Sequence, residues 1–210
     1  MNSNTIQAVI KGNIEAIDQG LGILNAITNE QYTKVVSQYV TSSIGQHFRH
    51  IVDLYLALRN AATEDVCTVT TIDYDQRRRG AAIETCKATA VDELLQIKDW
   101  LKGMLNFSDA EHSVIKTPEQ LFLPVNMVSE VSLSETESVC ISSSFIRELI
   151  FTSSHTVHHY ALISVLAKLQ GAKLQSGIGV APATASFIRE NSHECSSDVS
   201  QFPESKEFLA

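Results

Sequence analysis

The stretch SSSFIRELIFTSSHTVHHYALISVLAKL, residues 142–169, decides how the rest of the chain is interpreted. It contains no glycine or proline, and strong helix formers fill its second half, so it predicts one long helix that Gly171 can cap. On that helix His155 and His159 lie one turn apart on the same face. Two imidazoles at this spacing can hold one metal ion, and they can equally hydrogen-bond to neighbours or face solvent.

A second histidine pair lies earlier in the chain, within SSIGQHFRHIVDLYLALR, residues 42–59. Ser42 and Ser43 can cap a helix here, and His47 and His50 then share one helical face. An apolar stripe continues from His47, so this face turns towards the core, where a histidine needs a carboxylate, a carbonyl or a metal as its partner. We therefore expect the two helices to face each other, with a histidine of each pair at one ion.

Two further helices complete the predicted core. Apolar residues recur at helical spacing in residues 5–27 and in residues 77–105. Four apolar stripes are enough for a four-helix bundle, so the predicted fold class is all-α. The short β-type runs SVIKT, LFLPVNMV and SVCIS in residues 106–141 interrupt the helical pattern. They predict a small β-hairpin or extended insertion before the last helix.

The remaining segments predict connections. Residues 29–40 suit a short helical or irregular connector, and residues 68–74 suit an isolated extended one. Residues 177–187, GIGVAPATASF, predict a loop, because no strand precedes the glycines as a nucleotide-binding fingerprint requires. We place a four-helix domain at residues 1–187 and a polar C-terminal tail at residues 188–210.

A charged segment, DYDQRRR, lies at the predicted start of the third helix, residues 73–79. Asp75 is a candidate cap for that helix. Arg77 or Arg79 can reach a carboxylate of the site, since arginine pairs well with carboxylates. We expect Arg78 to face solvent.

Composition limits the classes of protein that fit. The chain has 210 residues and a net charge of −8, which suits one substantial domain and argues against nucleic-acid binding. No apolar stretch is long enough to cross a membrane, and the N-terminus does not resemble a signal peptide, so we expect a cytoplasmic protein without a membrane partner. Its cysteines form no CxxC pair and are expected to be reduced and mostly buried; they are Cys67, Cys86, Cys140 and Cys195.

Five motifs, in this order, resemble the DinB/YfiT-like superfamily. They are SIGQHFRH, DYDQRRR, FIRELIF, SHTVHHYAL and GVAPAT, and together they span most of the chain up to residue 187. The resemblance implies a four-helix bundle with up-down-down-up helix order. Many members bind a divalent metal, commonly nickel or zinc, through three histidines, and a related domain occurs in iron enzymes. Some members are S-transferases or isomerases that use a low-molecular-weight thiol.

Carried onto this chain, the resemblance implies His50, His155 and His159 as the metal ligands. His47 and His158 are additional histidines, and we treat them as candidate further ligands or outer partners. The implied cofactor is a divalent metal, with nickel or zinc ahead of iron.

Three neutral imidazoles leave coordination positions open, as a catalytic site does. An ion held there can lower the pKa of a bound water or thiol and so make it a nucleophile. Asp53 follows His50 by one helical turn, and Glu148 precedes His155 by two. Each carboxylate is a candidate outer partner or general base, with a surface salt bridge as the alternative.

Two functions follow from these observations. The first is a metal-dependent enzyme that activates a thiol or water for S-transfer or hydrolysis on a small-molecule substrate. The second is a non-catalytic helical bundle that binds a metal or ligand, and a site closed by a fourth protein ligand would favour it. Ile150 and Phe151 add apolar surface beside Leu149, so we expect a homodimer.

Overall fold

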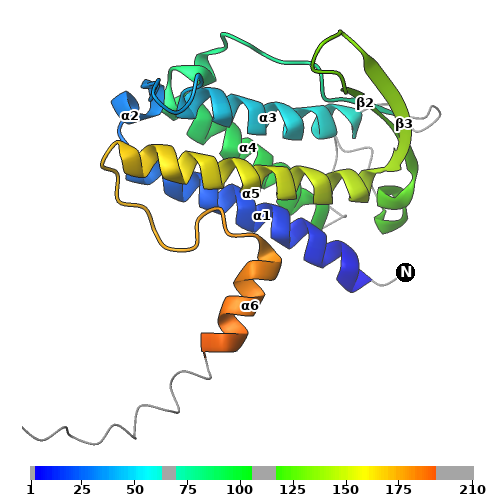
Figure 1. The fold of residues 1–210 in the computed structure, drawn as a ribbon. Coiled ribbons are helices and arrows are strands. Elements are labelled where there is room, and N and C mark those ends of the chain that lie inside the picture. The colour runs from blue at the N-terminus through cyan, green and yellow to red at the C-terminus, as the bar shows by residue number, and fades with distance from the viewer. Residues whose placement is uncertain (1–2, 63–69, 106–116, 193–210) are drawn as a thin grey trace, which may run out of the picture. The chain divides into compact units, whose positions relative to one another are not determined.

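A computed structural model describes residues 3–62, 70–105 and 117–192 (Figure 1). Contacts divide the chain into two compact units, residues 1–179 and residues 180–210. The first unit is mostly helical and carries one small sheet. Its boundary lies earlier than residue 187, where the sequence suggested one. Most of the expected tail lies outside the described residues, as do His112, His193, Cys67, Cys195 and nearly all of the SVIKT run.

Four long helices of the first unit lie side by side (Figure 1). Each packs against two of the others: α1 and α3 both contact α4 and α5. α1 and α5 run in one direction, and α3 and α4 run in the opposite one. The bounds are α1 Ser3–Ala26, α3 Ile44–Ala61, α4 Lys87–Leu105 and α5 Phe145–Leu169, with short helices α2 Asn29–Thr33, η1 Ala82–Glu84 and η2 Pro118–Phe122.

The apolar stripes of these helices form one core, as the sequence predicts. Phe48 lies on the face of α3 that packs against α5, and its ring centroid is 6.0 Å from that of Tyr160. Both side chains are completely buried, and burial of such aromatic rings is the main favourable term in packing of this kind. Other fully buried large side chains include Tyr32, Tyr55, Ile10, Ile17, Ile23, Leu24, Ile44, Ile51, Leu58 and Ile72.

The ends of α3 and α5 are set by local capping. Ser43 is the N-cap of α3 and forms a capping box with Gln46, which confirms one of the two predicted caps. At the end of α5, Gly171 adopts φ +81°, and Ala172 donates to the carbonyl of Ala167 at 2.9 Å. This is a Schellman motif, which glycine favours because a Cβ opposes a positive φ. α5 begins at Phe145 and not at Ser142, because the three preceding serines belong to a strand.

The third long helix starts later than predicted. α4 begins at Lys87, whereas the sequence pattern suggested a start near Arg77. The intervening residues turn back on themselves: Ala81 donates to the carbonyl of Arg78, and Gly80 has φ +78°. A left-handed residue ends helical continuity, so the charged segment is a loop. Asp75 therefore caps no helix; its carboxylate accepts from the backbone N–H of Glu130 and the hydroxyl of Ser138.

A three-stranded sheet with the order β1-β2-β3 lies beside the helices; its strands are β1 Thr71–Asp73, β2 Pro124–Glu130 and β3 Ser138–Ser144. β2 and β3 form an antiparallel hairpin, as predicted for the insertion before the last helix. β1 pairs in parallel with β2, with Ile72 opposite Met127, so the predicted isolation of residues 68–74 is wrong. The partner lies far away in the sequence, and strand propensity does not reveal such a partner.

Two other expectations need correction. In the second unit, Pro182–Ser192 forms helix α6, although residues 177–187 were expected to form a loop. Proline is well tolerated in the first turn of a helix, where its missing N–H costs nothing.

The described cysteines, Cys86 and Cys140, are free thiols and both exposed, not buried. Within the described residues, no helix combines the length and apolar character needed to span a membrane.

Gly45 allows α3 to pack closely against η1, and we expect Gly45→Ala to destabilise the fold. A Cβ at this position would lie 2.1 Å from the carbonyl oxygen of Glu84 and 2.8 Å from the Tyr32 ring. Backbone must therefore move, and we expect a loss of about 1–3 kcal/mol in the free energy of unfolding. Gly12→Ala is the matched control, since a Cβ there meets no atom within 4 Å. It should stabilise by about 0.5–1 kcal/mol. Urea unfolding followed by circular dichroism measures both, and equal changes would refute the packing argument.

Candidate metal centre

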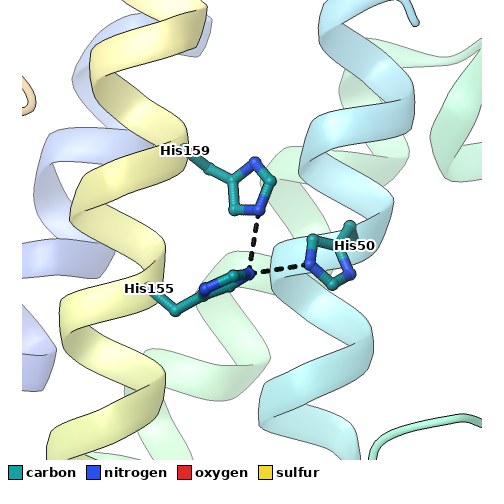
Figure 2. Close-up of side chains that lie close together, drawn as sticks. All are labelled: His50, His155 and His159. Carbon is teal, nitrogen blue, oxygen red and sulfur yellow. Dashed lines mark hydrogen bonds between the residues drawn. The ribbon is translucent and has the colours of Figure 1, made fainter. Parts of the chain in front are cut away.

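Three histidines from two helices converge at one point. His50 comes from α3, and His155 and His159 come from successive turns of α5, which runs antiparallel to α3 (Figure 2). His155 Nε2 lies 2.9 Å from His50 Nε2 and 3.0 Å from His159 Nε2. One ligand atom from each ring lies within 4.8 Å of the other two. The structure thus brings together the three residues singled out in the sequence, in an arrangement that could hold a metal ion.

Hydrogen bonding among the three rings cannot satisfy all of these nitrogens. A ring nitrogen of a neutral imidazole offers either one hydrogen or one lone pair. His155 Nε2 faces two nitrogen partners, so it forms a good hydrogen bond with only one of them. The other close nitrogen contact is then unfavourable. A cation at the point of convergence would accept all three lone pairs at once, and imidazole nitrogens are typical ligands for zinc, nickel and iron.

His47, on α3, contacts the ring of His159 through the nitrogen that does not face the other clustered histidines. The Nδ1 atoms of His47 and His159 are 3.1 Å apart. When His159 presents the lone pair of Nε2 to an ion, its hydrogen is on Nδ1 and is donated to His47. His47 is therefore an outer partner here and does not complete the cluster. His158 is exposed on the outer side of α5, and its ring centroid lies 5.5 Å from that of His159.

The clustered histidines are held neutral at physiological pH. Burial, followed by the nearby Arg77 guanidinium and the other histidines, lowers the pKa of His50 to about 3. Burial, followed by His155 and His47, lowers the pKa of His159 to about 3 as well. Burial also lowers the pKa of His47 and of His155. Neutral imidazoles are the form that binds metals, so burial prepares these rings for ligation.

Arg77 contacts the site in a way the sequence did not predict. The sequence suggested that Arg77 or Arg79 reaches a carboxylate. Instead, Arg77 Nη1 lies 2.6 Å from His50 Nδ1, and Arg77 Nε donates to the carbonyl of Tyr74. Arginine has no acceptor, so His50 Nδ1 is the acceptor in this contact. A guanidinium that donates to an imidazole cannot be deduced from spacing.

Asp53 holds a loop and does not support a histidine. Its carboxylate is buried and accepts from Arg78 Nε at 2.7 Å, from the backbone N–H of Arg78 at 3.1 Å, and from Arg49 at 3.3 Å. Arg78 also pairs with Glu93 on α4. Arg78 is exposed, as expected, but it is also paired with two carboxylates. Within the described residues, Asp53 bonds to arginines and to no clustered histidine, so its suggested role as an outer partner of a histidine is not seen. The separation of Asp53 and Arg78 in sequence hid their pairing.

Glu148 is likewise engaged away from the histidines. It is completely buried, and it accepts hydrogen bonds from Tyr74 Oη, Ser143 Oγ and Arg147 Nη1 at 2.9, 2.5 and 2.7 Å. None of the hydrogen bonds that Glu148 makes within the described residues reaches a clustered histidine. Glu148 therefore joins the start of α5 to β3 and to the residue after β1, and these bonds do not make it an outer partner of a histidine.

An open pocket of about 570 Å³ lies beside the three-histidine cluster. Its walls combine two of the clustered histidines and their partner with three arginines. A volume of this size suits a small molecule. The residues that line it are Ser42, Gln46, His47, Arg49, His50, Arg77, Arg79, Gly80, Glu84 and His159.

Comparisons with known proteins give limited guidance. No family model matches the sequence, and no solved structure matches it. Among curated proteins it is similar to one named FK506-binding protein 5 from Rhizopus delemar, with 29% identity over 122 residues. The match covers 58% of this chain but only 29% of that protein, so the chain spans less than a third of its relative. The resemblance to the DinB/YfiT-like superfamily stays a prediction.

We expect the metal-free protein to lose stability as the pH falls below about 6.5. The folded pKa of His50 is about 3, against 6.5 for an ordinary histidine. Between these values the unfolded chain takes up a proton that the folded chain refuses, so the stabilisation is present above pH 6.5 and is lost towards pH 3. One such group should cost about 1–2 kcal/mol between pH 7.5 and pH 5. Urea unfolding in the presence of EDTA measures it, and His50→Gln should reduce the pH dependence. A stability that does not change between the two pH values would contradict the neutral cluster.

Proposed function

We propose that the first unit is a metal-dependent enzyme of the DinB/YfiT-like type that acts on a small molecule. The observation that carries the proposal is the convergence of three Nε2 atoms from His50, His155 and His159, closer than their own hydrogen bonding can satisfy. A second support is the order of helix directions, in which α1 and α5 oppose α3 and α4. The up-down-down-up four-helix bundle of that superfamily has this order.

The donor set fits a divalent transition metal. Three neutral imidazoles and no carboxylate favour zinc, nickel or iron over magnesium or calcium, which prefer oxygen ligands. A bound ion of this kind would supply open coordination positions and a lowered pKa for a water or thiol placed there. His47 would fix the ring of His159 by accepting its Nδ1 hydrogen.

The surroundings of the cluster favour catalysis over a purely structural ion. A structural site is usually closed by a fourth protein ligand. The two candidates for that role are poorly placed: His47 directs Nδ1 at His159, and His158 is exposed. The pocket beside His50 and His159 offers space for a small substrate instead. S-transfer with a low-molecular-weight thiol, or hydrolysis of a small ester or amide, are the reactions that suit such a centre.

Alanine variants of the three ligands test the metal site. His50→Ala, His155→Ala and His159→Ala each remove one of three donors, so each should lower zinc affinity by more than about tenfold. His47→Ala should have a smaller effect through the orientation of His159. His158→Ala is the control on the same helix and should bind as the wild type does. Metal content of untagged protein, measured by mass spectrometry, gives the readout, with circular dichroism to show that helices remain.

Full metal occupancy in both the His155→Ala and the His159→Ala variant would refute the three-histidine site. A different result would revise it: retention of metal by His50→Ala together with loss from His47→Ala would place the ion one turn along α3. If the wild-type protein bound none of nickel, zinc and iron, the non-catalytic alternative would be favoured.

We also propose that the protein pairs as a homodimer through the outer face of α5. Ile150 is 53% exposed and Phe151 36% exposed, and further apolar residues on α5 are exposed as well. They are Leu162, Val165 and Leu169. Burying such a face between two copies is favourable. Light scattering at micromolar concentration should give the mass of a dimer, and Val165→Lys should shift it towards the monomer. A monomer mass for the wild type would count against this.

A further inference from the structure

Two arginines, Arg77 and Arg79, lie beside the three-histidine cluster. Arg77 and Arg79 both line the pocket and are exposed. Within the described residues, neither forms an ion pair with a carboxylate. Arg49 and Arg78 differ, since they pair with Asp53, Glu84 and Glu93. The charged residues that line the pocket are three arginines and one glutamate, a net charge of +2, although the whole chain has a net charge of −8. A cationic pocket of this kind attracts anions.

Arg77 is held in position by hydrogen bonds to neutral groups and by the anchoring of its neighbours, and not by an ion pair. Tyr74, the residue after β1, donates its backbone N–H to the carbonyl of Val128 and its hydroxyl to the buried Glu148. Asp53 anchors Arg78 on the other side. The segment between these anchors places Arg77 over His50, where both of its hydrogen-bond acceptors are neutral groups: the Tyr74 carbonyl and His50 Nδ1. The guanidinium thus keeps its full charge available.

The contact between Arg77 and His50 conflicts with metal ligation. His50 accepts from Arg77 at Nδ1, so the hydrogen of a neutral ring is on Nε2. Ligation through Nε2 needs the opposite arrangement, with the hydrogen on Nδ1. Two donors would then face each other across 2.6 Å. A loaded centre therefore requires the Arg77 guanidinium to move away from His50, and its exposed position permits that movement.

We propose that Arg77 and Arg79 bind a carboxylate of the small-molecule substrate beside the three-histidine centre. The planar fork of a guanidinium matches a carboxylate with two parallel hydrogen bonds. This bond draws Arg77 away from His50 Nδ1, which leaves that nitrogen able to carry the hydrogen. The inference rests on the proposed metal function for its substrate, but the anion site itself can be tested without metal.

The geometry also implies that the anion and the metal favour each other's binding. A carboxylate removes the donor that opposes ligation by His50, so it should raise metal affinity. By linkage, a bound metal must raise the affinity for the carboxylate by the same factor. A substrate that carries a carboxylate would in this way strengthen the centre on which it reacts.

The first experiment measures anion binding to the metal-free protein. Propionate is the probe, propionamide the uncharged isostere, and inorganic phosphate the competing anion; titrations are followed by NMR. Propionate should bind and propionamide should not. Arg77→Met should weaken propionate about tenfold, the cost of one charge-assisted pair, and Arg79→Met should weaken it less. Arg59→Met, at the far end of α3 and outside the pocket, should have no effect. Propionate affinity that is unchanged in both pocket variants overturns the proposal, and tighter binding of phosphate overturns the choice of a carboxylate.

The second experiment measures zinc affinity by competition with a chromophoric chelator. Propionate should tighten zinc binding to the wild type several-fold and leave Arg77→Met unaffected. Without propionate, Arg77→Met should bind zinc more tightly than the wild type, because the opposing donor is gone. Arg79→Met is the matched control, since it removes the same charge from the same pocket but no contact with His50, and it should gain less. Weaker zinc binding by Arg77→Met overturns the proposed conflict.

The two proposals fail in different ways. Zinc binding without any Arg77-dependent binding of propionate overturns the anion site and leaves the metal centre. Arg77-dependent binding of propionate without zinc, nickel or iron binding supports the anion site and removes the metal function.

Discussion

The register between α3 and α5 is the constraint on which the site depends. These antiparallel helices meet through Phe48 and Tyr160, two completely buried rings that lie next in sequence to His47 and His159. Tyr160 also approaches Gly20 on α1 so closely that a Cβ there would lie 2.2 Å from its hydroxyl oxygen. Because a close-packed core does not let helices slide past each other, the packing of Tyr160 fixes the position of α5 along its axis relative to α3 and α1. A shift by one turn would separate His50 from His155 and His159.

Two buried carboxylates, one on α3 and one on α5, hold the neighbouring segments against the helices. Asp53 and Glu148 are both almost fully buried, and a buried charge is costly unless it is paired and hydrogen-bonded. Asp53 meets this need with Arg49 and Arg78, and Glu148 with Tyr74, Ser143 and Arg147. These bonds tie the segment after β1 to α3 and α5. The carboxylates thus act on the site indirectly, by placing Arg77 beside His50.

The resulting site combines neutral ligands with nearby positive charge. Burial keeps His50 and His159 unprotonated, while Arg77 and Arg79 carry charge in the lining of the same pocket. Imidazole nitrogen donors suit a transition metal, and guanidinium groups suit an anion. The two groups of residues are contiguous, since Arg77 directly contacts one of the three histidines. This contact is the basis of our proposal that metal binding and anion binding are coupled in the pocket.

The sequence by itself determined the features that depend on local physics. Apolar periodicity located the long helices, Ser43 and Gly171 marked two of their ends, and turn-by-turn spacing put His155 and His159 on one face. The hairpin between α4 and α5 was visible from its β-type runs. Each of these signals acts within a few residues along the chain, where propensity and capping operate.

Only the tertiary structure decided what depends on partners distant in sequence. The pairing of β1 with β2, the burial of Asp53 against Arg78, and the direction of Arg77 towards a histidine all join residues far apart along the chain. The turn at Gly80, which delays α4, belongs to the same loop and is stabilised by those contacts. Candidate partners for a charged side chain are numerous in any sequence. Burial and packing select one of them, and neither is a property of the residue or its neighbours alone.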